Sequence, residues 1–361
     1  MKTLNYVIFY IFLIIDVNLY SQSGSFCATS PNVPNFLATK SGNLNTPSDS
    51  YTIGIYLHVM HHSNGTGGQT QLEVNTAYNT LVSDYQPYNI HFSLLGTDEI
   101  NNDTYYNQTS FYADQYGNTD LNGDGKFDIF SINSHNNAID IYLFGDDQLN
   151  FGLAANIPGT ALVIGGNAFG MNLASSHVLT HEVGHCLGLY HTFHGTYSGE
   201  SGSCPELVNE SNGSTCGDYV ADTPADPEPI FDCGTQSSCT WNCYNSFTDA
   251  NGAHYNPNTH LYMAYTFPNC MNLHTVGQVS RIFNSIANSS FLINTLSCRT
   301  SISNTNYNSN TTVNACVNAQ LNLTNVTITN NATVTFNTNG NGIVINAPFQ
   351  ATIGSTLQIN K

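Results

Sequence analysis

The sequence predicts an α/β fold of the α+β kind: a mixed sheet packed with helices, and a small all-β module at the C-terminal end. Three observations predict it. Short runs of alternating apolar residues indicate strands at residues 53–59, 90–94, 139–143 and 161–164. Helical spacing of apolar residues recurs at 72–85 and at 178–187. From residue 300 the composition changes to Asn, Thr and short apolar runs, which indicates small strands joined by turns.

The N-terminal residues are typical of a signal peptide, which we place at residues 1–21. Met1-Lys2 precedes an apolar run from Tyr6 to Ile15, and polar residues follow it. This run is too short to span a membrane, and no later segment approaches about 20 apolar residues. We therefore expect a secreted protein without stable membrane insertion; membrane anchoring is the alternative.

Charge and cysteine content limit the partners and the compartment. The formal net charge of −18 excludes nucleic acid as a partner, because phosphate binding needs cationic patches. Ten cysteines in an exported chain indicate disulfides, whose pairing the sequence leaves open. Cys186 is the exception, because it falls inside the predicted metal-binding helix and is best interpreted as a small buried apolar residue.

Residues 22–50 are rich in Ser, Asn, Pro and Thr and are interpreted as a pro-segment or an N-terminal extension. Cys27 within them has two interpretations. A thiolate is a good zinc ligand, so a cysteine in a removable segment could close the metal site and keep an enzyme latent. A structural disulfide to Cys298 or Cys316 is the other interpretation.

The main domain is placed at residues 51–299, where strand, helix and strand follow one another. The strand at 161–164 comes directly before the metal-binding helix. We expect the free edge of this strand to lie beside the active site and to pair with an extended peptide substrate.

A candidate calcium loop lies between the predicted strands. It offers oxygen ligands at positions 1, 3, 5 and 9 of an EF-hand-like pattern, namely Asp120, Asn122, Asp124 and Asp128. Gly125 occupies position 6, but Ser131 stands at position 12, where a bidentate glutamate is expected. An ordinary polar surface turn is the alternative.

The metal-binding helix contains His181-Glu182-Val183-Gly184-His185, followed by Gly188 and His191. His181 and His185 are one helical turn apart, so both imidazoles can reach one metal ion. Glu182 cannot point to the metal beside them but can reach a water molecule bound to it, as a general base does. Gly188 permits the left-handed turn that brings His191 back as the third ligand.

The segment after His191 is turn-rich and cysteine-dense, so we expect disulfides and calcium to order it. Asp218, Asp222 and Thr223 are clustered oxygen donors there; calcium binding and turn capping are equally compatible with them. The last predicted unit, residues 300–361, contains no histidine and almost no charge. We assign it no chemistry and consider cell-surface or carbohydrate contact, or a spacer role.

These motifs resemble those of the metzincin zinc metallopeptidases, and in detail those of the pappalysin family. The resemblance covers residues 51–298 and rests on His181 to His191 with Thr192-Phe193, Cys216 to Pro224, Tyr262-Met263-Ala264-Tyr265, and Thr275 to Val279. It implies that His181, His185 and His191 bind zinc and that Glu182 is the general base. It also implies that Met263 forms the Met-turn floor and that Tyr265 stabilises the oxyanion. Some relatives carry calcium and a cysteine switch.

The sequence thus predicts a secreted zinc-dependent endopeptidase acting on proteins or peptides, with Zn²⁺ and also Ca²⁺ as cofactors. One alternative is a zinc-containing adhesin or binding protein with a vestigial peptidase domain. The intact Glu182 disfavours it, because a structural zinc site has no use for a base. A zinc hydrolase of other substrates is the second alternative.

Overall fold

The computed structural model describes Cys27, Thr29 and residues 50–107, 128–197, 204–228, 233–299, 301–315, 320–338 and 342–360. The predicted signal peptide and all of the 22–50 segment except Cys27, Thr29 and Ser50 lie outside the described residues, as do Asp120, Asn122 and Asp124 of the candidate calcium loop. Among the described residues, no helix combines the length and apolar character needed to cross a membrane.

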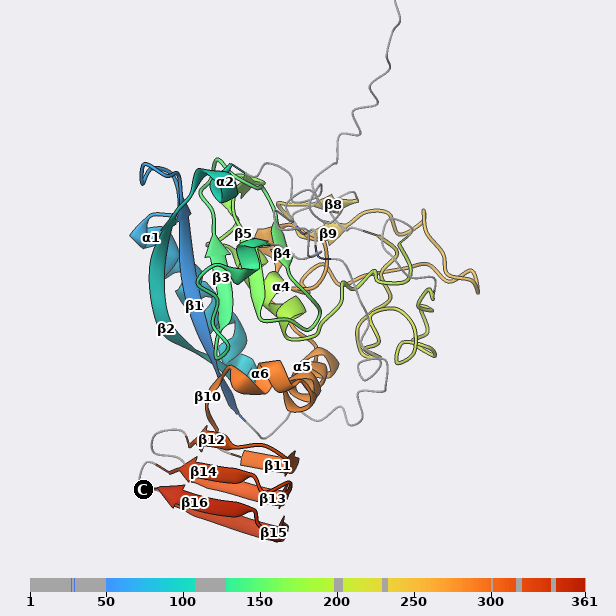
Figure 1. Ribbon diagram of the computed structural model, residues 1–361. Helices are drawn as coiled ribbons and strands as arrows, with labels where there is room; N and C mark the ends of the chain where they lie inside the picture. Colours follow the sequence, from blue (N-terminus) through green and yellow to red (C-terminus); the bar gives the residue numbers. More distant parts are fainter. Residues whose placement is uncertain are drawn as a thin grey trace, which may run out of the picture.

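A six-stranded mixed sheet forms the centre of the main domain (Figure 1). Its strands are β1 (Tyr51–His61), β2 (Ile90–Asn101), β3 (Ile139–Leu143), β4 (Gly152–Ala154), β5 (Ala161–Ile164) and β10 (Leu296–Arg299). β1 pairs with β2 and β3 in parallel, β3 pairs with β5 in parallel, and β4 and β10 add antiparallel edges. The mixed α/β architecture predicted from the sequence is confirmed.

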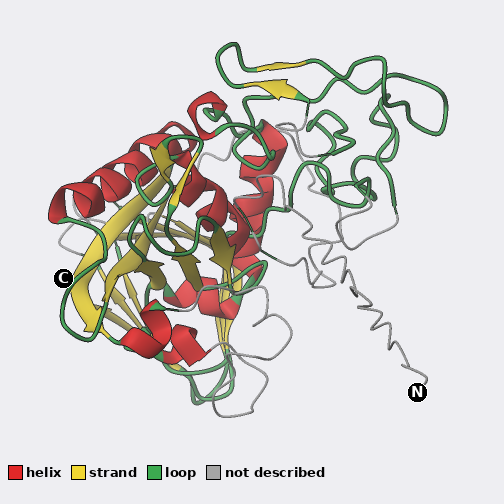
Figure 2. Cartoon of the chain, turned by 90° about the horizontal axis from the view of Figure 1, so that it is seen from above, coloured by secondary structure: helices red, strands yellow, loops and turns green. Residues whose placement is uncertain are grey.

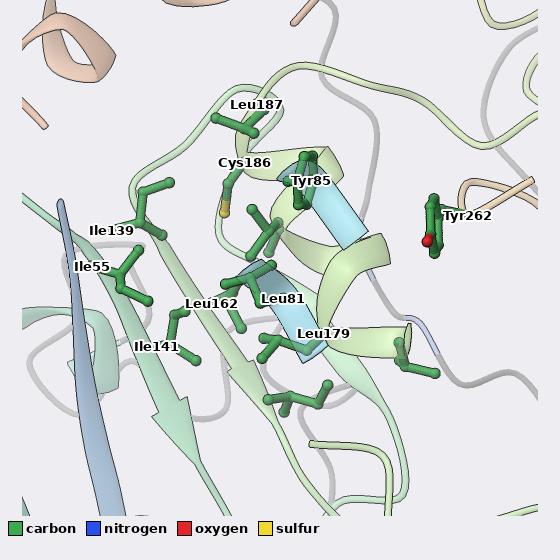
Figure 3. Close-up of a cluster of buried hydrophobic side chains, with 14 of the residues drawn as sticks. Ile55, Leu81, Tyr85, Ile139, Ile141, Leu162, Leu179, Cys186, Leu187 and Tyr262 are labelled. Carbon is green, nitrogen blue, oxygen red and sulfur yellow. The ribbon is translucent and has the colours of Figure 1, made fainter. Parts of the chain in front are cut away.

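Two helices cover one face of this sheet: α1 (Gln71–Tyr85) and α4 (His177–Cys186). α1 begins at Thr70, whose side chain accepts a hydrogen bond from the Glu73 N–H while Glu73 reaches back to the Thr70 N–H, a capping box. The apolar core lies between sheet and helices (Figure 3). It includes Ile55, Ile139, Ile141 and Leu162 from the strands and Leu81, Tyr85, Leu179 and Cys186 from the helices.

The opposite face of the sheet has a smaller core of its own. Alternate residues of a strand point to opposite faces, so Ile55 and Leu57 of β1 join the core under the helices while Met60 joins the second cluster with Tyr142 and Phe144. β1 is therefore buried on both faces, as a central strand should be.

The edge strand beside α4 is β4, and the prediction that the strand at 161–164 has a free edge is wrong. β5 pairs with β3 on one side and with β4 on the other. β4 was not predicted from the sequence, because its three residues are too few to display an alternating pattern.

The segment between α4 and α5 (Val276–Asn288) consists mostly of loops, which lie to one side of the sheet and helices (Figure 2). Three disulfides cross-link it: Cys204–Cys216, Cys233–Cys243 and Cys239–Cys270. The remaining short elements are η1 (Gln86–Tyr88), α2 (Asp103–Tyr106), η2 (Asp128–Ser131), β6 (Asn167–Ala168), β7 (Met171–Asn172), β8 (Gly234–Thr235), β9 (Thr240–Trp241), η4 (Pro268–Cys270) and α6 (Ser290–Asn294).

The C-terminal strands form two further parallel sheets that face each other across an apolar interior. One contains β11 (Ser301–Tyr307), β13 (Leu321–Ile328) and β15 (Ile343–Ala351); the other contains β12 (Thr311–Asn314), β14 (Thr333–Asn337) and β16 (Thr356–Asn360). Asn337 donates to Asn314, 23 residues earlier, and Asn360 donates to Asn337 at the same spacing. The chain therefore winds in stacked parallel coils, which the alternating pattern alone did not predict.

Candidate metal centre and active site

The metal-binding helix is α4, and its ends are set by local residues. Ser176 caps its first turn by accepting a hydrogen bond from the Val178 N–H at 3.2 Å. After Cys186 the chain turns at Gly188, whose φ of +97° lies in the left-handed region. The Leu189 N–H then bonds to the Gly184 carbonyl at 2.9 Å, and His191 follows beside the helix. The structure thus gives Gly188 the turning position that the sequence predicts for it.

The Nε2 atoms of the three predicted zinc ligands converge. His185 Nε2 lies 3.1 Å from His181 Nε2 and 3.0 Å from His191 Nε2. The other ring nitrogens face carbonyl oxygens: His181 Nδ1 is 2.6 Å from Tyr262 O, and His185 Nδ1 is 2.8 Å from Leu189 O. A carbonyl can only accept, so these Nδ1 atoms carry the proton and the Nε2 lone pairs point inward.

This geometry fits a zinc ion. Burial lowers the pKa of both His181 and His185, and the electrostatic effect of the neighbouring His191 lowers it further, so both imidazoles are held in the neutral form. Lone pairs that face one another at such short distances repel unless a cation lies among them. Three converging imidazole nitrogens in a buried site are a donor set that Zn²⁺ prefers. The residues present therefore fit the metal.

Glu182 is fully buried beside the three histidines. Burial raises its pKa to about 8. Its Oε2 accepts a hydrogen bond from the Thr29 hydroxyl at 3.0 Å. The side chain fits only because β4 carries Gly152, where a Cβ would overlap the Glu182 carboxylate. Gly152 and Thr29 were both missed from the sequence; Thr29 could have been noticed, because it lies two residues after Cys27 and an extended segment presents both on one side.

Met263 and Tyr265 lie on the other side of the histidines. Met263 is fully buried, and its sulfur packs where a Cβ on Gly184 of α4 would be. Its carbonyl accepts a hydrogen bond from the Thr192 N–H at 3.1 Å. The ring centroid of Tyr265 lies 4.6 Å from that of His191. The structure thus brings the predicted floor residue and the predicted oxyanion partner to the same centre.

Cys27 also lies at this centre. It keeps its thiol instead of forming a disulfide, so the structure does not contain the alternative bond to Cys298 or Cys316. Its Sγ is 3.5 Å from His185 Nε2, and its carbonyl accepts a hydrogen bond from the Tyr265 hydroxyl at 2.6 Å. The four candidate ligand atoms of Cys27, His181, His185 and His191 all lie within 4.8 Å of one another.

Two backbone contacts hold Cys27 and Thr29 against β4. Cys27 forms a parallel bridge with Gly152, and the Ala154 N–H donates to the Thr29 hydroxyl at 2.8 Å. The edge strand that would receive a substrate is therefore covered by the N-terminal segment at these positions.

The predicted calcium ligands do not all share one location. Asp218 and Thr223 are buried in the disulfide-rich segment. Asp222 instead accepts hydrogen bonds from the Thr275 hydroxyl and the Gly277 N–H, both at 2.8 Å, and so holds the start of α5. Asp128 begins η2, away from this segment in the sequence.

Glu206 is a buried carboxylate that the sequence analysis missed. Neither of its side-chain oxygens has a hydrogen-bond partner among the described residues. Burial, and next the nearby Asp218, raise its pKa to about 9, while burial raises the pKa of Asp218 to about 8. Two buried carboxyl groups this close to each other need protons or a cation. No local sequence signal marks Glu206, because only the fold brings it to Asp218.

Comparisons with known proteins agree with this centre. Residues 162–287 match the peptidase family model described as Pregnancy-associated plasma protein-A, and residues 69–192 match that of the M12B reprolysin-like metallopeptidases. An extracellular metalloprotease of Podospora anserina is 28% identical over 255 residues, which cover 67% of this chain and 77% of the relative. One from Arthroderma otae is 29% identical over 239 residues, covering 64% of this chain and 76% of the relative.

A solved structure, mature mirolysin of Tannerella forsythia in complex with a cleaved peptide, covers 70% of this chain and 97% of its own at 18% identity and a TM-score of 0.42.

Proposed function

We propose that the chain is a secreted zinc metalloendopeptidase of the metzincin type, which hydrolyses proteins or peptides with Glu182 as the general base. The two metallopeptidase family models and the relatives named extracellular metalloproteases support this. The observation that carries the proposal is the placement of Glu182, one residue after His181, beside three converging Nε2 atoms. Secretion is supported by three disulfides and by relatives named extracellular.

Each residue has a role that follows from its position. His181, His185 and His191 would hold the ion, which when bound acidifies a water molecule and polarises the scissile carbonyl. Glu182 accepts the proton of that water and delivers it to the leaving amine.

Tyr265 and β4 position the substrate. The hydroxyl of Tyr265 already donates to a carbonyl oxygen at this centre, that of Cys27, so it can donate to the oxygen that gains charge during hydrolysis. An extended peptide would pair with the backbone of Gly152 and Ala154 at the sheet edge, where Cys27 and Thr29 now lie.

We also propose that the N-terminal segment keeps the enzyme latent. Cys27 would occupy the coordination position that the water needs, since its sulfur lies at the convergence of the histidines. Its backbone covers β4, and its carbonyl engages the Tyr265 hydroxyl. Removal of the segment would make both the proposed water-binding position at the histidines and the edge of β4 accessible.

Calcium is the second proposed cofactor. Glu206, Asp218 and Thr223 would bind it within the disulfide-rich segment, which is supported by the two Glu206 oxygens without described partners and by the raised pKa of both acids. The loop at Asp120 to Asp128 stays a prediction, as does a surface or carbohydrate contact of residues 300–361.

The replacement Glu182→Gln tests the central proposal. The amide keeps the shape of the side chain but cannot accept the proton, so we expect zinc to remain bound and casein hydrolysis to fall by about 10²–10⁴-fold. Zinc content is measured on the same preparation by elemental analysis. Full activity in this variant would refute the role of Glu182, and inactive wild-type protein lacking residues 22–50 would favour the vestigial-domain alternative.

A further inference from the structure

A second cluster of histidine and aspartate side chains lies on the face of the sheet away from α4. It is built from three adjacent strands, β1, β2 and β3, and from the turn before β3 (Figure 1). His58 comes from β1, Asp98 from β2 and Asp140 from β3, while His135 precedes β3 in the chain. His58 lies between Leu57 and Val59 in sequence, and both of these face the helices, so His58 faces the other way.

Two imidazoles meet one carboxylate oxygen in this cluster. His58 Nε2 lies 3.1 Å from Asp140 Oδ1, and His135 Nδ1 lies 2.8 Å from the same atom. The three donor atoms are all within 4.8 Å of one another. Asp140 and His58 are buried, while the His135 side chain is 30% exposed, so a small ion or a water molecule can reach the group.

Further contacts fix the orientation of these donors. The opposite nitrogen of His58, Nδ1, is 2.7 Å from Asp98 Oδ1, and Asn133 donates to the other Asp98 oxygen at 2.8 Å. The His135 N–H donates to Asp140 Oδ2 at 2.8 Å, which turns Oδ1 toward the two imidazoles. A carboxylate behind one nitrogen of a histidine, with the other nitrogen facing outward, is the usual support of a metal-ligating imidazole.

Either a proton or a metal ion must lie between His58 and one of its two aspartate partners. Each ring nitrogen faces a carboxylate oxygen, but a neutral imidazole carries only one N–H. If Nδ1–H donates to Asp98, a lone pair on Nε2 faces Asp140 Oδ1, and a proton or a metal ion must lie between them.

We propose that His58, His135 and Asp140 bind a second divalent transition-metal ion. Asp98 holds His58 in the ligating orientation, and water completes the coordination on the exposed side of His135. Two imidazole nitrogens and one carboxylate oxygen suit zinc and its neighbours in the first transition row, so zinc is the test ion. The charges of Asp98 and Asp140 balance the ion.

This ion would act on stability and not on hydrolysis. Its ligands lie on the opposite face of the sheet from α4, and they join β1 and β3 to the turn that contains His135. An ion that binds the folded chain stabilises it in proportion to the logarithm of its concentration over its Kd. The bound ion would therefore stabilise the packing of β1 against β3 and against the turn that contains His135.

The experiment measures zinc per chain in four full-length proteins after saturation with zinc and desalting. Wild type should hold two equivalents, and His135→Ala should hold one, the catalytic ion. His62→Ala is the matched control: its side chain is 29% exposed and its Nδ1 also lies 2.8 Å from an aspartate oxygen, that of Asp103, but the pair belongs to no candidate metal group among the described residues. This variant should hold two. His185→Ala should lose the catalytic equivalent and keep the other.

Wild type with a single equivalent that disappears in His185→Ala would overturn the proposal. Two equivalents in His135→Ala would overturn it as well. The variant Asp98→Asn provides a second test in case His135→Ala fails to fold, because it leaves all three ligands in place. It should bind zinc at the second site about 10- to 100-fold more weakly than wild type; unchanged affinity would count against the site.

Discussion

The hydroxyl of Thr29 lies 3.0 Å from Oε2 of Glu182 and joins the N-terminal segment to the proposed catalytic base. The hydroxyl oxygen of Thr29 also accepts a hydrogen bond from the Ala154 N–H of the edge strand. Thr29 therefore contacts both the proposed base and the edge strand, while Cys27, two residues earlier, contacts His185. The segment has two separate contacts with the catalytic groups, and each can be removed by one substitution.

We expect Thr29→Val to raise the basal activity of the full-length chain. Valine has nearly the shape of threonine but cannot donate to Glu182, and a hydrogen bond to a charged group contributes about 1.5–3 kcal/mol. Loss of that energy should increase casein hydrolysis before processing by about 10- to 100-fold. Thr29→Ser, which keeps the hydroxyl, is the control and should stay latent. If Thr29→Val is as latent as wild type while Cys27→Ser is active, the thiol alone maintains latency.

Tyr265→Phe should slow hydrolysis in the form that lacks residues 22–50. Without the hydroxyl, one donor to the oxyanion is lost, which costs about 10²–10³ in kcat and leaves KM almost unchanged. Zinc content should not change, because phenylalanine keeps the ring that contacts His191. Tyr262→Phe is the control, since the contact of Tyr262 with His181 is made by its backbone carbonyl. Equal kcat values for Tyr265→Phe and wild type would exclude the oxyanion role.

Calcium should raise the melting temperature of the wild-type protein. The ion would neutralise the buried Glu206 and Asp218, and it binds only the folded chain. Glu206→Gln should reduce this response, whereas Glu210→Gln, at an exposed position in the same segment, should retain it. The measurement is thermal unfolding in zinc-containing buffer with and without millimolar calcium. An equal rise in both variants would place any calcium site elsewhere.

Stability should fall between about pH 6.5 and pH 4 because of His274. Burial lowers the pKa of this histidine from its ordinary 6.5 to about 4. In that interval the unfolded chain binds a proton that the folded chain does not, so lowering the pH favours unfolding. The loss is on the order of 3 kcal/mol at the acidic end. His274→Gln should flatten this part of the curve of unfolding free energy against pH; an unchanged slope would assign it to other groups.

Local patterns were sufficient for much of the fold. The alternating residues of β1 and the helical spacing of α1 are properties of contiguous sequence, and both elements formed where predicted. β4 could not be predicted, because three residues carry no period and this strand exists only through its pairing with β5. The prediction of a free edge at β5 failed for that reason.

The sequence by itself determined how the predicted zinc ligands are placed relative to one another. His181, Glu182 and His185 lie within one helical turn, and Gly188 provides the reversal before His191, so their relative positions follow from backbone geometry alone. Only the tertiary structure decided what surrounds them. Thr29 reaches Glu182 across 153 residues, and His58 meets Asp140 across 82. Contacts at such separations depend on how strands order themselves in a sheet, and no local pattern of residues encodes that order.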